Sequence, residues 1–371
     1  LGRVNPTRSA LPWTAAAVLS LFAIPMPLAT AQEAEDSPFA EFVQPDFPFF
    51  TQTVDAREFS GELAAGNLAP RGIVIRLGEG LHACYDPDLL RLALLWRETP
   101  EGEFLTMDGM GPGSYRMPGR KSGAGQKSLP RPLGEFLTAT GLYAGWQSGA
   151  PVFEDPREPA PDPAEPGRGP IDANAGRWEG LALGGDDLYL ICTVAGTRVV
   201  EHLRAFRLGE RAGVQRSFRL DAHEKPLTVV LGEGEAVSAR CATADVRRVE
   251  GRLVATFAPS AEERDHVVVL VPAGMEDAGA LAEQLAKPGF DSFEQPSSPR
   301  WPEPVVTVGV LSEKAEAYVI DEAPLPVPNP WKRNVRLSGF DFFSKVGRLA
   351  ACTFDGDVWL ADGVADGSRE V

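Results

Sequence analysis

Residues 178–220 read WEGLALGGDDLYLICTVAGTRVVEHLRAFRLGERAGVQRSFRL, and this stretch decides the fold. It contains apolar and β-branched runs of strand length, separated by short turns at 184–187, 195–196 and 208–210. Turns this short join antiparallel neighbours in hairpins. Short strands joined in this way are typical of an antiparallel β-sandwich. We therefore predict an all-β fold built around this segment.

The same pattern extends in both directions along the chain. Further strands are predicted at 71–77, 81–85, 89–96, 227–231, 236–246, 252–257 and 266–271, although the leucine-rich segment 89–96 also suits a helical turn. One helix is predicted at 275–287, because Leu281 and Leu285 lie one helical turn apart and Pro288-Gly289 ends the segment.

Differences in proline content and in the pattern of strands and turns divide the chain into segments. Residues 32–60 are predicted to form an extended lead segment, 61–290 the sandwich and 291–304 a proline-rich linker. In residues 305–371, strands alternate with turns such as Asp355-Gly356, as in a propeller blade. A propeller needs about four blades or more, so we expect this segment to be the first blade, as a fragment, and the chain to be truncated.

The N-terminal residues 1–31 have the organisation of a secretory signal peptide. Arg3 and Arg8 precede an apolar stretch, which ends at the small-residue signature Ala29-Thr30-Ala31. The apolar stretch is shorter than the roughly 20 residues that span a bilayer. We predict cleavage after Ala31, export to the periplasm or the extracellular space, and no stable membrane insertion afterwards. A retained N-terminal anchor is the alternative.

The charge balance argues against nucleic acid as a partner. The chain has 36 basic and 52 acidic residues, which gives a formal net charge of −16. Nucleic-acid binding depends on a basic surface that neutralises phosphates, so we predict no nucleic-acid partner. The four cysteines, Cys84, Cys192, Cys241 and Cys352, form no C-x-x-C pair. Each lies in an apolar, strand-like run, so disulfides and buried free thiols both remain open.

The sequence contains no fingerprint of a known catalytic or cofactor site. It has no G-x-S-x-G elbow, no G-x-G-x-x-G that opens a helix and no phosphate-binding P-loop. Its four histidines have no metal-ligand spacing. We therefore assign no catalytic residue and predict neither a cofactor site nor a metal site in this chain.

Candidates for ligand contact are Asp86, Asp88, Trp146 and Arg157. Asp86 and Asp88 flank Pro87 and could present paired carboxylates, as glycosidases do, although Asp-Pro-Asp is also an ordinary turn. Trp146 could stack on a sugar ring, as could Trp96, Trp178 and Trp301, although such tryptophans more often lie in a core or an interface. Arg157 belongs to the short segment Asp155-Pro156-Arg157.

Two sets of segments resemble known families. The phrase TFDGDVW at 353–359 resembles the blade motif of secreted propellers of the glucose/sorbosone dehydrogenase type. The segments NLAPRG at 67–72, CYDPDLLR at 84–91, GLYAGWQ at 141–147 and DPR at 155–157 resemble an uncharacterised domain at the front of large exported bacterial proteins. In those proteins such a propeller follows, often with a haem-bearing module. One departure is Ser344-Lys345-Val346-Gly347, where the family usually has an Asp-Gly turn.

The resemblance implies a non-catalytic role for this chain within a larger protein. The chain would be a non-catalytic front domain of an exported, sugar-dehydrogenase-like propeller protein that oxidises or binds carbohydrate. Quinone, calcium or haem would then bind in missing C-terminal regions, and carbohydrate would be the partner. A stand-alone extracytoplasmic module for carbohydrate binding or scaffolding is the alternative. Both interpretations predict that this chain alone has no dehydrogenase turnover.

Overall fold

The computed structural model describes part of the chain, and within that part every regular element is a β-strand. The described residues are 48–60, 64, 66–106, 129–161, 169–275, 286–295, 301–327, 329–331, 335–343, 347–353 and 357–364. The predicted signal peptide and almost all of the interior of the predicted helix at 275–287 lie outside them. The all-β prediction is confirmed, and no helix long and apolar enough to cross a membrane occurs among these residues.

The first sheet of the body is an antiparallel meander of five strands in sequence order. Its strands are β1 (Phe49–Asp55), β2 (Leu68–Gly78), β3 (Leu81–Asp86), β4 (Arg91–Arg97) and β5 (Glu135–Ala139). The hairpin between β2 and β3 turns at Glu79 and Gly80, which both have positive φ angles. The strands predicted at 71–77 and 81–85 are therefore confirmed.

The second sheet contains the segment that decides the fold. Its strand order is β12-β15-β10-β9-β8-β7. The strands are β7 (Gly176–Gly184), β8 (Asp187–Val194), β9 (Thr197–Leu208), β10 (Arg211–Leu220), β12 (Val237–Cys241) and β15 (Arg264–Pro272). The strands β7 to β10 pair in order through three short hairpins, as the sequence predicts.

The third sheet has the order β13-β14-β11-β6. Its strands are β6 (Trp146–Ser148), β11 (Leu227–Glu233), β13 (Asp245–Val249) and β14 (Arg252–Phe257). The single strand predicted at 236–246 is wrong, because the chain bends at 242–244 and passes from one sheet to another. Small residues at this bend, Ala242, Thr243 and Ala244, interrupt the pairing without a glycine or proline to signal it.

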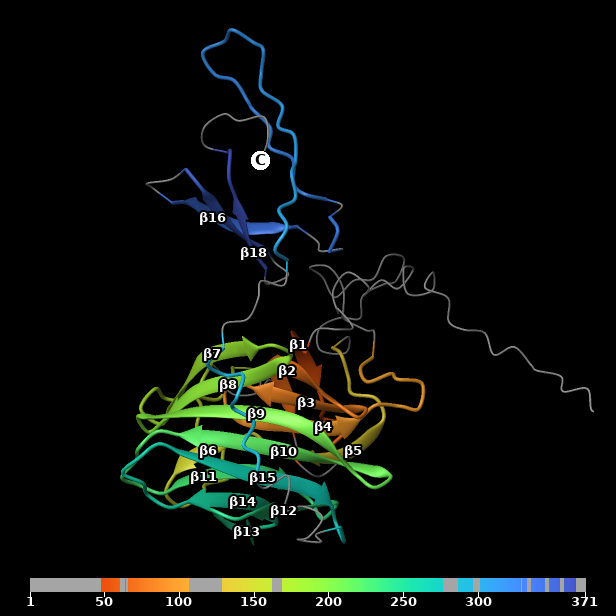
Figure 1. The fold of residues 1–371 in the computed structure, drawn as a ribbon, viewed down its shortest axis with the longest axis vertical. Coiled ribbons are helices and arrows are strands. Elements are labelled where there is room, and N and C mark those ends of the chain that lie inside the picture. The colour runs from red at the N-terminus through yellow and green to blue at the C-terminus, as the bar shows by residue number, and fades with distance from the viewer. Residues whose placement is uncertain are drawn as a thin grey trace, which may run out of the picture.

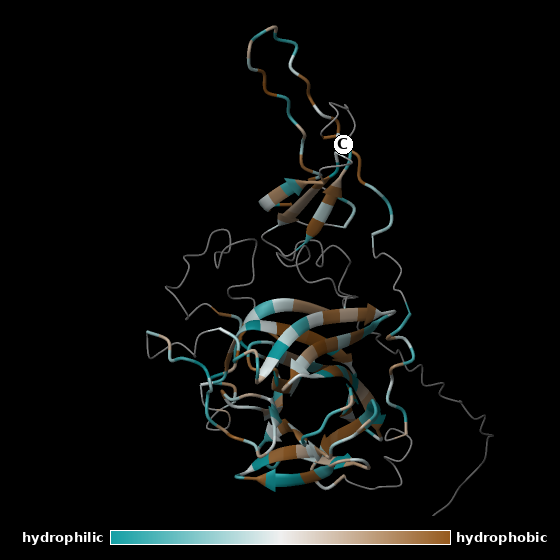
Figure 2. Cartoon of the chain, turned by 90° about the vertical axis from the view of Figure 1, so that its left-hand side faces the viewer, coloured by the Kyte–Doolittle hydropathy of each residue, from teal (hydrophilic) through white to brown (hydrophobic). Residues whose placement is uncertain are grey.

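All three sheets contribute to one apolar core (Figure 2). Trp146 from the third sheet packs against Phe218 and Phe257, with ring centroids 5.1 and 5.9 Å away. Tyr85 of the first sheet is buried in the same cluster. Aromatic rings bury large apolar areas, so these contacts join the sheets into one sandwich-like body.

A buried arginine fixes the turn between β3 and β4. Arg91 donates from Nε to Asp86 at 3.0 Å, and neither side chain is exposed. Its Nη1 also donates to Asn67 Oδ1 and to the carbonyl oxygen of Gly141. A Cβ at Gly145 would lie 2.4 Å from the Cα of Arg91, so only glycine permits this approach. The turn that carries Asp88 is therefore held rigidly.

A short segment, 286–295, lies across the outer face of the second sheet, and we call it the strap. Phe290 of the strap is buried and stacks on Tyr189 of β8, while the Arg219 guanidinium lies 4.7 Å above its ring. The Ser292 hydroxyl donates to Asp187 at 2.7 Å. The strap thus covers apolar surface that the sheet would otherwise expose.

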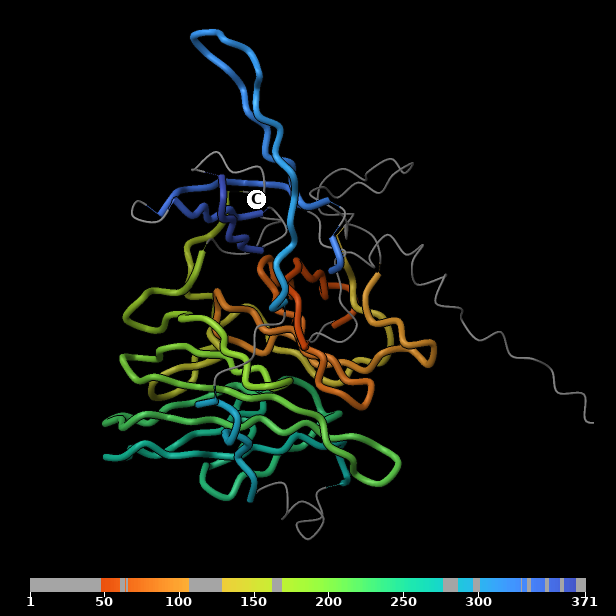
Figure 3. The backbone as a smooth tube through the Cα atoms, turned by 45° about the horizontal axis from the view of Figure 1, so that its top comes forward, coloured from red at the N-terminus to blue at the C-terminus, as the bar shows by residue number. Residues whose placement is uncertain are grey.

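The C-terminal sheet is a separate group of three antiparallel strands, β16 (Leu337–Phe342), β17 (Leu349–Thr353) and β18 (Val358–Ala361). Figures 1 and 3 show it beyond the body, preceded by an extended segment, residues 301–327, which we call the arm. Val310 and Glu322 of the arm pair through two backbone hydrogen bonds of 2.8 and 2.9 Å. The predicted Asp355-Gly356 turn lies outside the described residues.

Candidate functional site

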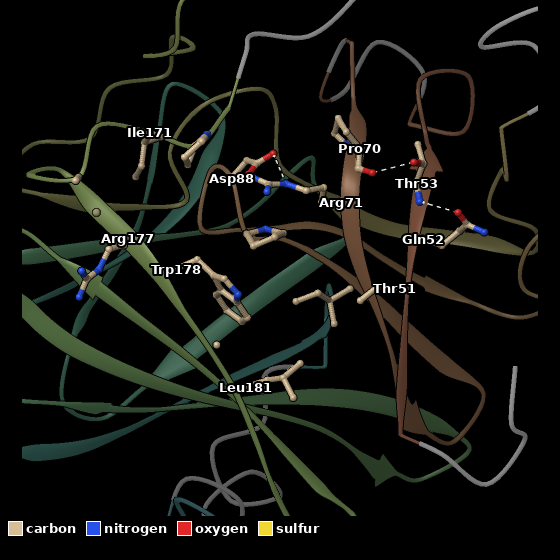
Figure 4. Close-up of a pocket in the computed structure, with 16 residues that line it drawn as sticks. Thr51, Gln52, Thr53, Pro70, Arg71, Asp88, Ile171, Arg177, Trp178 and Leu181 are labelled. Atoms are coloured by element: carbon tan, nitrogen blue, oxygen red, sulfur yellow. Dashed lines mark hydrogen bonds and ion pairs between the residues drawn. The ribbon is translucent and has the colours of Figure 1, made fainter. Parts of the chain in front are cut away.

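A cleft of about 830 Å³ opens between the first and second sheets (Figure 4). One wall comes from β1 and β2, and the other comes from β7. The turn that carries Asp88 and the segment 170–173 close one end. Both β1 and β7 are edge strands of their sheets, so the cleft lies where each of the two sheets stops.

Trp178 lies in the wall formed by β7. The pairing register of β7 shifts between Trp178 and Gly180, and Gly180 has a φ angle of +144°. Such a bulge bends a strand and re-aims its side chains. The half-buried indole packs on Tyr85, with ring centroids 5.6 Å apart, and also lines the cleft.

Asp88 and Arg71 form an ion pair at the closed end of the cleft. Arg71 donates from Nε to Asp88 Oδ2 at 3.2 Å and from Nη2 to Oδ1. Asp86 Oδ1 accepts the backbone N–H of Asp88 at 3.0 Å, which is the geometry of an Asx turn. Asp86 therefore shapes the turn, and Asp88 faces the cleft.

A second arginine, Arg177, lines the cleft next to Trp178. It donates from Nη2 to Glu179 at 3.0 Å, and the Thr193 hydroxyl donates to the same carboxylate oxygen. These two contacts lower the pKa of Glu179, with the Thr193 hydrogen bond as the largest cause. Glu179 is therefore a stable anionic partner for Arg177 at neutral pH.

The wall opposite Trp178 is polar along β1. The Thr53 hydroxyl donates to the carbonyl oxygen of Pro70 at 2.8 Å, and Gln52 Oε1 accepts the backbone N–H of Thr53 at 3.0 Å. Thr51 is exposed on the same strand, and Ile73 supplies an apolar base between the polar groups. The cleft thus combines one aromatic ring and several hydrogen-bonding groups with a lining that is mainly apolar.

Of the four ligand-contact candidates Asp86, Asp88, Trp146 and Arg157, the structure brings only one to the cleft. Asp88 lines it, whereas Asp86 is fully buried against Arg91. Trp146 lies in the core, where its ring faces are covered. Arg157 is buried too, and it is held by Asp155 through hydrogen bonds of 2.8 and 2.9 Å. Burial of the Asp155 carboxyl opposes ionisation, but these hydrogen bonds outweigh it and lower its pKa.

The cleft contains residues that the sequence did not single out for a site. Arg71 and Arg177 line it, each paired with a carboxylate, and Trp178 was one tryptophan among several. A weak signal was present, because Trp178 is flanked by Arg177 and Glu179 and so alternates with charged residues at a predicted strand edge. Nothing in the sequence links Arg71 to Asp88 across two strands.

A buried polar group lies beneath Trp178. The hydroxyl of Tyr85 and the thiol of Cys192 are hydrogen-bonded to each other, and burial raises the pKa of each well above its usual value. Glu201 and Arg216 form a buried ion pair of 2.7 Å nearby. The four cysteines are free. Among the described residues no group of three or more His, Cys, Asp or Glu side chains is placed to hold a metal ion.

Comparison with known families gives one match. Residues 83–201 match a family described as Domain of unknown function (DUF6797). The matched range runs from β3 into β9 and includes Asp88, Arg177 and Trp178 of the cleft. A search of curated proteins and a search of solved structures each found no match.

Proposed function

We propose that this chain is a non-catalytic carbohydrate-binding module of an exported protein and that sugar binds in the cleft beside Trp178. One observation carries the proposal: a half-buried indole lines a cleft in which hydroxyl, amide and guanidinium groups lie among apolar side chains. Sugars present apolar C–H faces to aromatic rings and hydroxyls to polar groups, and an indole has an apolar body with a polar N–H. The cleft volume of about 830 Å³ is within the range of small-ligand sites.

The arrangement of carboxylates supports binding over hydrolysis. Glycoside hydrolysis uses two carboxyl groups, one on each side of the scissile bond. Asp88 is the one carboxylate among the described residues that line the cleft, and it is paired with Arg71. Asp86, which could have been the second, is bound to Arg91 in the interior.

The second part of the proposal concerns the protein that contains this module. We propose that the module precedes a propeller of the sugar-dehydrogenase type and is exported through the signal peptide at 1–31. Support comes from the resemblance of residues 353–359 to a blade motif and from the small antiparallel sheet β16–β18 in the same region. A stand-alone extracytoplasmic module for carbohydrate binding or scaffolding is the alternative.

Binding is tested by titrating the chain with a panel of oligosaccharides, using calorimetry. We expect at least one saccharide to bind, and Trp178→Ala to weaken its binding about tenfold or more, because ring stacking is lost. Tyr318→Ala is the control, since Tyr318 is 92% exposed on the arm and outside the cleft. Absence of binding, or equal affinity for the Trp178 variant, would refute the proposed site.

The non-catalytic part is tested separately. We expect no dye-linked oxidation of sugars by this chain, even with quinone and calcium added. Robust turnover would place an active site within the chain. Export is tested by mass spectrometry of the secreted protein, which should begin at Gln32. A mature protein that retains Leu28 would contradict the predicted cleavage.

A further inference from the structure

The bulge in β7 places two apolar side chains on the same wall of the cleft. Trp178 pairs with Cys192, and Leu181 pairs with Leu190, across the register shift. Cys192 and Leu190 are two residues apart on β8, so they share one face of the sheet with their partners. Trp178 and Leu181 are both half-buried, pack against the main core and line the cleft. This wall therefore presents an aromatic ring and an aliphatic side chain.

The opposite wall, formed by β1 and β2, adds apolar groups of its own. Ile73 of β2 belongs to the same core and lines the cleft. Thr51 of β1 pairs with Ile73, so its side chain, which carries a methyl group, lies on the same face. Figure 4 shows Thr51 across the cleft from Trp178 and Leu181. A flat ring held between the walls would therefore contact apolar groups on both of its faces.

The arginines that line the cleft leave no unpaired positive charge for a ligand. Arg71 donates from Nε to Asp88 at 3.2 Å. Arg177 precedes Trp178 on β7, so its side chain points to the opposite face of the strand, where it is bound to Glu179 at 3.0 Å. Burial of an ionic ligand costs free energy unless an opposite charge receives it. The cleft therefore favours an uncharged ligand.

Polar groups lie at the margin of the cleft, between the two walls. Arg71 and Asp88 form its closed end, and the Arg71 side chain is 62% exposed, against 7% for Asp88. Gln52 lies on β1, an edge strand, and its Oε1 accepts the backbone N–H of Thr53. Hydroxyl groups that project sideways from a ring would reach this margin. Hydroxyl groups that project above or below the ring would meet the apolar walls.

From this arrangement we infer that the ligand of the cleft is a neutral oligosaccharide of glucose or xylose units, which is held between Trp178 and the wall that carries Ile73. The inference rests on the proposed carbohydrate-binding function and narrows its ligand class. In a β-linked pyranose of glucose or xylose, all ring hydroxyls are equatorial. Such a ring has C–H groups on both faces and hydroxyls around its edge, which matches two apolar walls and a polar margin. Mannose and galactose each carry one axial hydroxyl, which would lie against a wall.

Calorimetry with the unmodified chain tests the configuration of the sugar. The ligands are β-linked oligomers of glucose, xylose, mannose and galactose of equal length. We expect the glucose or the xylose oligomer to bind about tenfold tighter than the other two, because an axial hydroxyl would be buried without a partner. The tighter of these two oligomers identifies the preferred unit. Equal affinities for all four, or tighter binding of mannose or galactose, would overturn the inference and leave the proposed function standing. No binding of any saccharide would refute both.

A second comparison tests the charge of the ligand. The glucose oligomer is compared with a glucuronic acid oligomer of the same linkage and length. We expect the acidic oligomer to bind no tighter than the neutral one, and the affinity of the neutral oligomer to change less than about twofold as salt rises. Tighter binding of the acidic oligomer, weakened by salt, would overturn the neutral ligand class.

A variant tests whether the wall of β7 sets the configuration. Leu181→Ala opens space beside Trp178, so we expect it to weaken binding of the glucose or xylose oligomer several-fold and to reduce the preference over mannose and galactose. The matched control is Leu325→Ala, because Leu325 is 45% exposed on the arm and lies outside the cleft. An unchanged preference in a folded Leu181 variant would overturn the inference. The comparison of sugars on the unmodified chain decides it if that variant does not fold.

Discussion

The body and the C-terminal sheet are built from similar strands but place their apolar side chains differently. In the body, apolar residues of three sheets face one another and are almost fully buried. In the C-terminal sheet, Phe340, Val358 and Leu360 remain 67%, 66% and 59% exposed. A strand pattern therefore predicts a strand, whereas burial depends on whether a second layer covers it.

The C-terminal sheet is also apolar on both faces. Phe340 pairs with Ala351, and Ala351 pairs with Trp359, so these three share one face. Val358 and Leu360 alternate with Trp359 and lie on the other face. In the body, by contrast, the strap packs over apolar side chains on the outer face of the second sheet. The difference suggests that the body holds its own stability and the C-terminal sheet contributes little to it.

The largest expected effect on stability comes from removing Arg91, which forms the buried ion pair and hydrogen bonds of the body. Arg91→Ala would leave Asp86 charged and unpaired in the interior, which typically costs about 3–5 kcal/mol. Chemical denaturation should show a large decrease in the free energy of unfolding. Arg348→Ala is the matched control, because Arg348 forms an exposed pair with Asp362 in the C-terminal sheet. Equal losses for both variants would show that the two regions do not differ as described.

A smaller effect is expected from acid, and it should be confined to the body. All four histidines precede residue 301, and burial together with nearby His223 and Arg264 lowers the pKa of His266 to about 4. The unfolded chain, with a histidine pKa of about 6.5, then binds more protons than the folded one between these values. Stability should fall as the pH decreases from about 6.5 to about 4, by on the order of 2 kcal/mol for this residue.

The variant His266→Gln separates this contribution from those of the other groups. It should flatten the dependence of unfolding free energy on pH across the same window, because glutamine does not titrate. His202 is also buried with a lowered pKa, so His202→Gln should flatten the profile independently. A profile unchanged in both variants would rule out these histidines as the source of acid sensitivity.

The smallest effect on stability is expected from removing the C-terminal region. Truncation after residue 300 should change the unfolding free energy of the body by less than about 0.5 kcal/mol, because the strap is retained. The shortened chain should be more soluble, since the exposed apolar side chains of the arm and of the C-terminal sheet are lost. Denaturation and light scattering measure both outcomes. Unfolding of the truncated chain would mean that β16–β18 belong to the core of the body.

Local signals made part of the fold predictable. The strands β7 to β10 are joined by short turns such as Ala195-Gly196, where both residues have positive φ angles. Because such turns join consecutive strands, their pairing could be predicted from the local sequence. The division of 236–246 between two sheets was missed, because β12 pairs with β15 and β13 pairs with β14. Such pairings between distant segments leave no local trace in the sequence.

The candidate site was harder to predict than the fold. Trp146 and Trp178 both lie in strands next to charged or polar residues, yet one is in the core and the other borders the cleft. The difference comes from the aromatic rings that pack over Trp146, whereas Trp178 faces the cleft between the first and second sheets. Asp88 was identified as a candidate, but its partner Arg71 on β2 was not, because no local pattern links the two residues.

The strap has a mechanical consequence. The chain leaves the body through residues 286–295, so a pull on the C-terminal region loads the strap before it loads any hydrogen bond between strands. The load falls first on single contacts, such as Ser292 with Asp187 and Phe290 with Tyr189, which can yield one after another. Peeling of the strap would dissipate the force and lengthen the tether, while the sheets and the cleft stay intact.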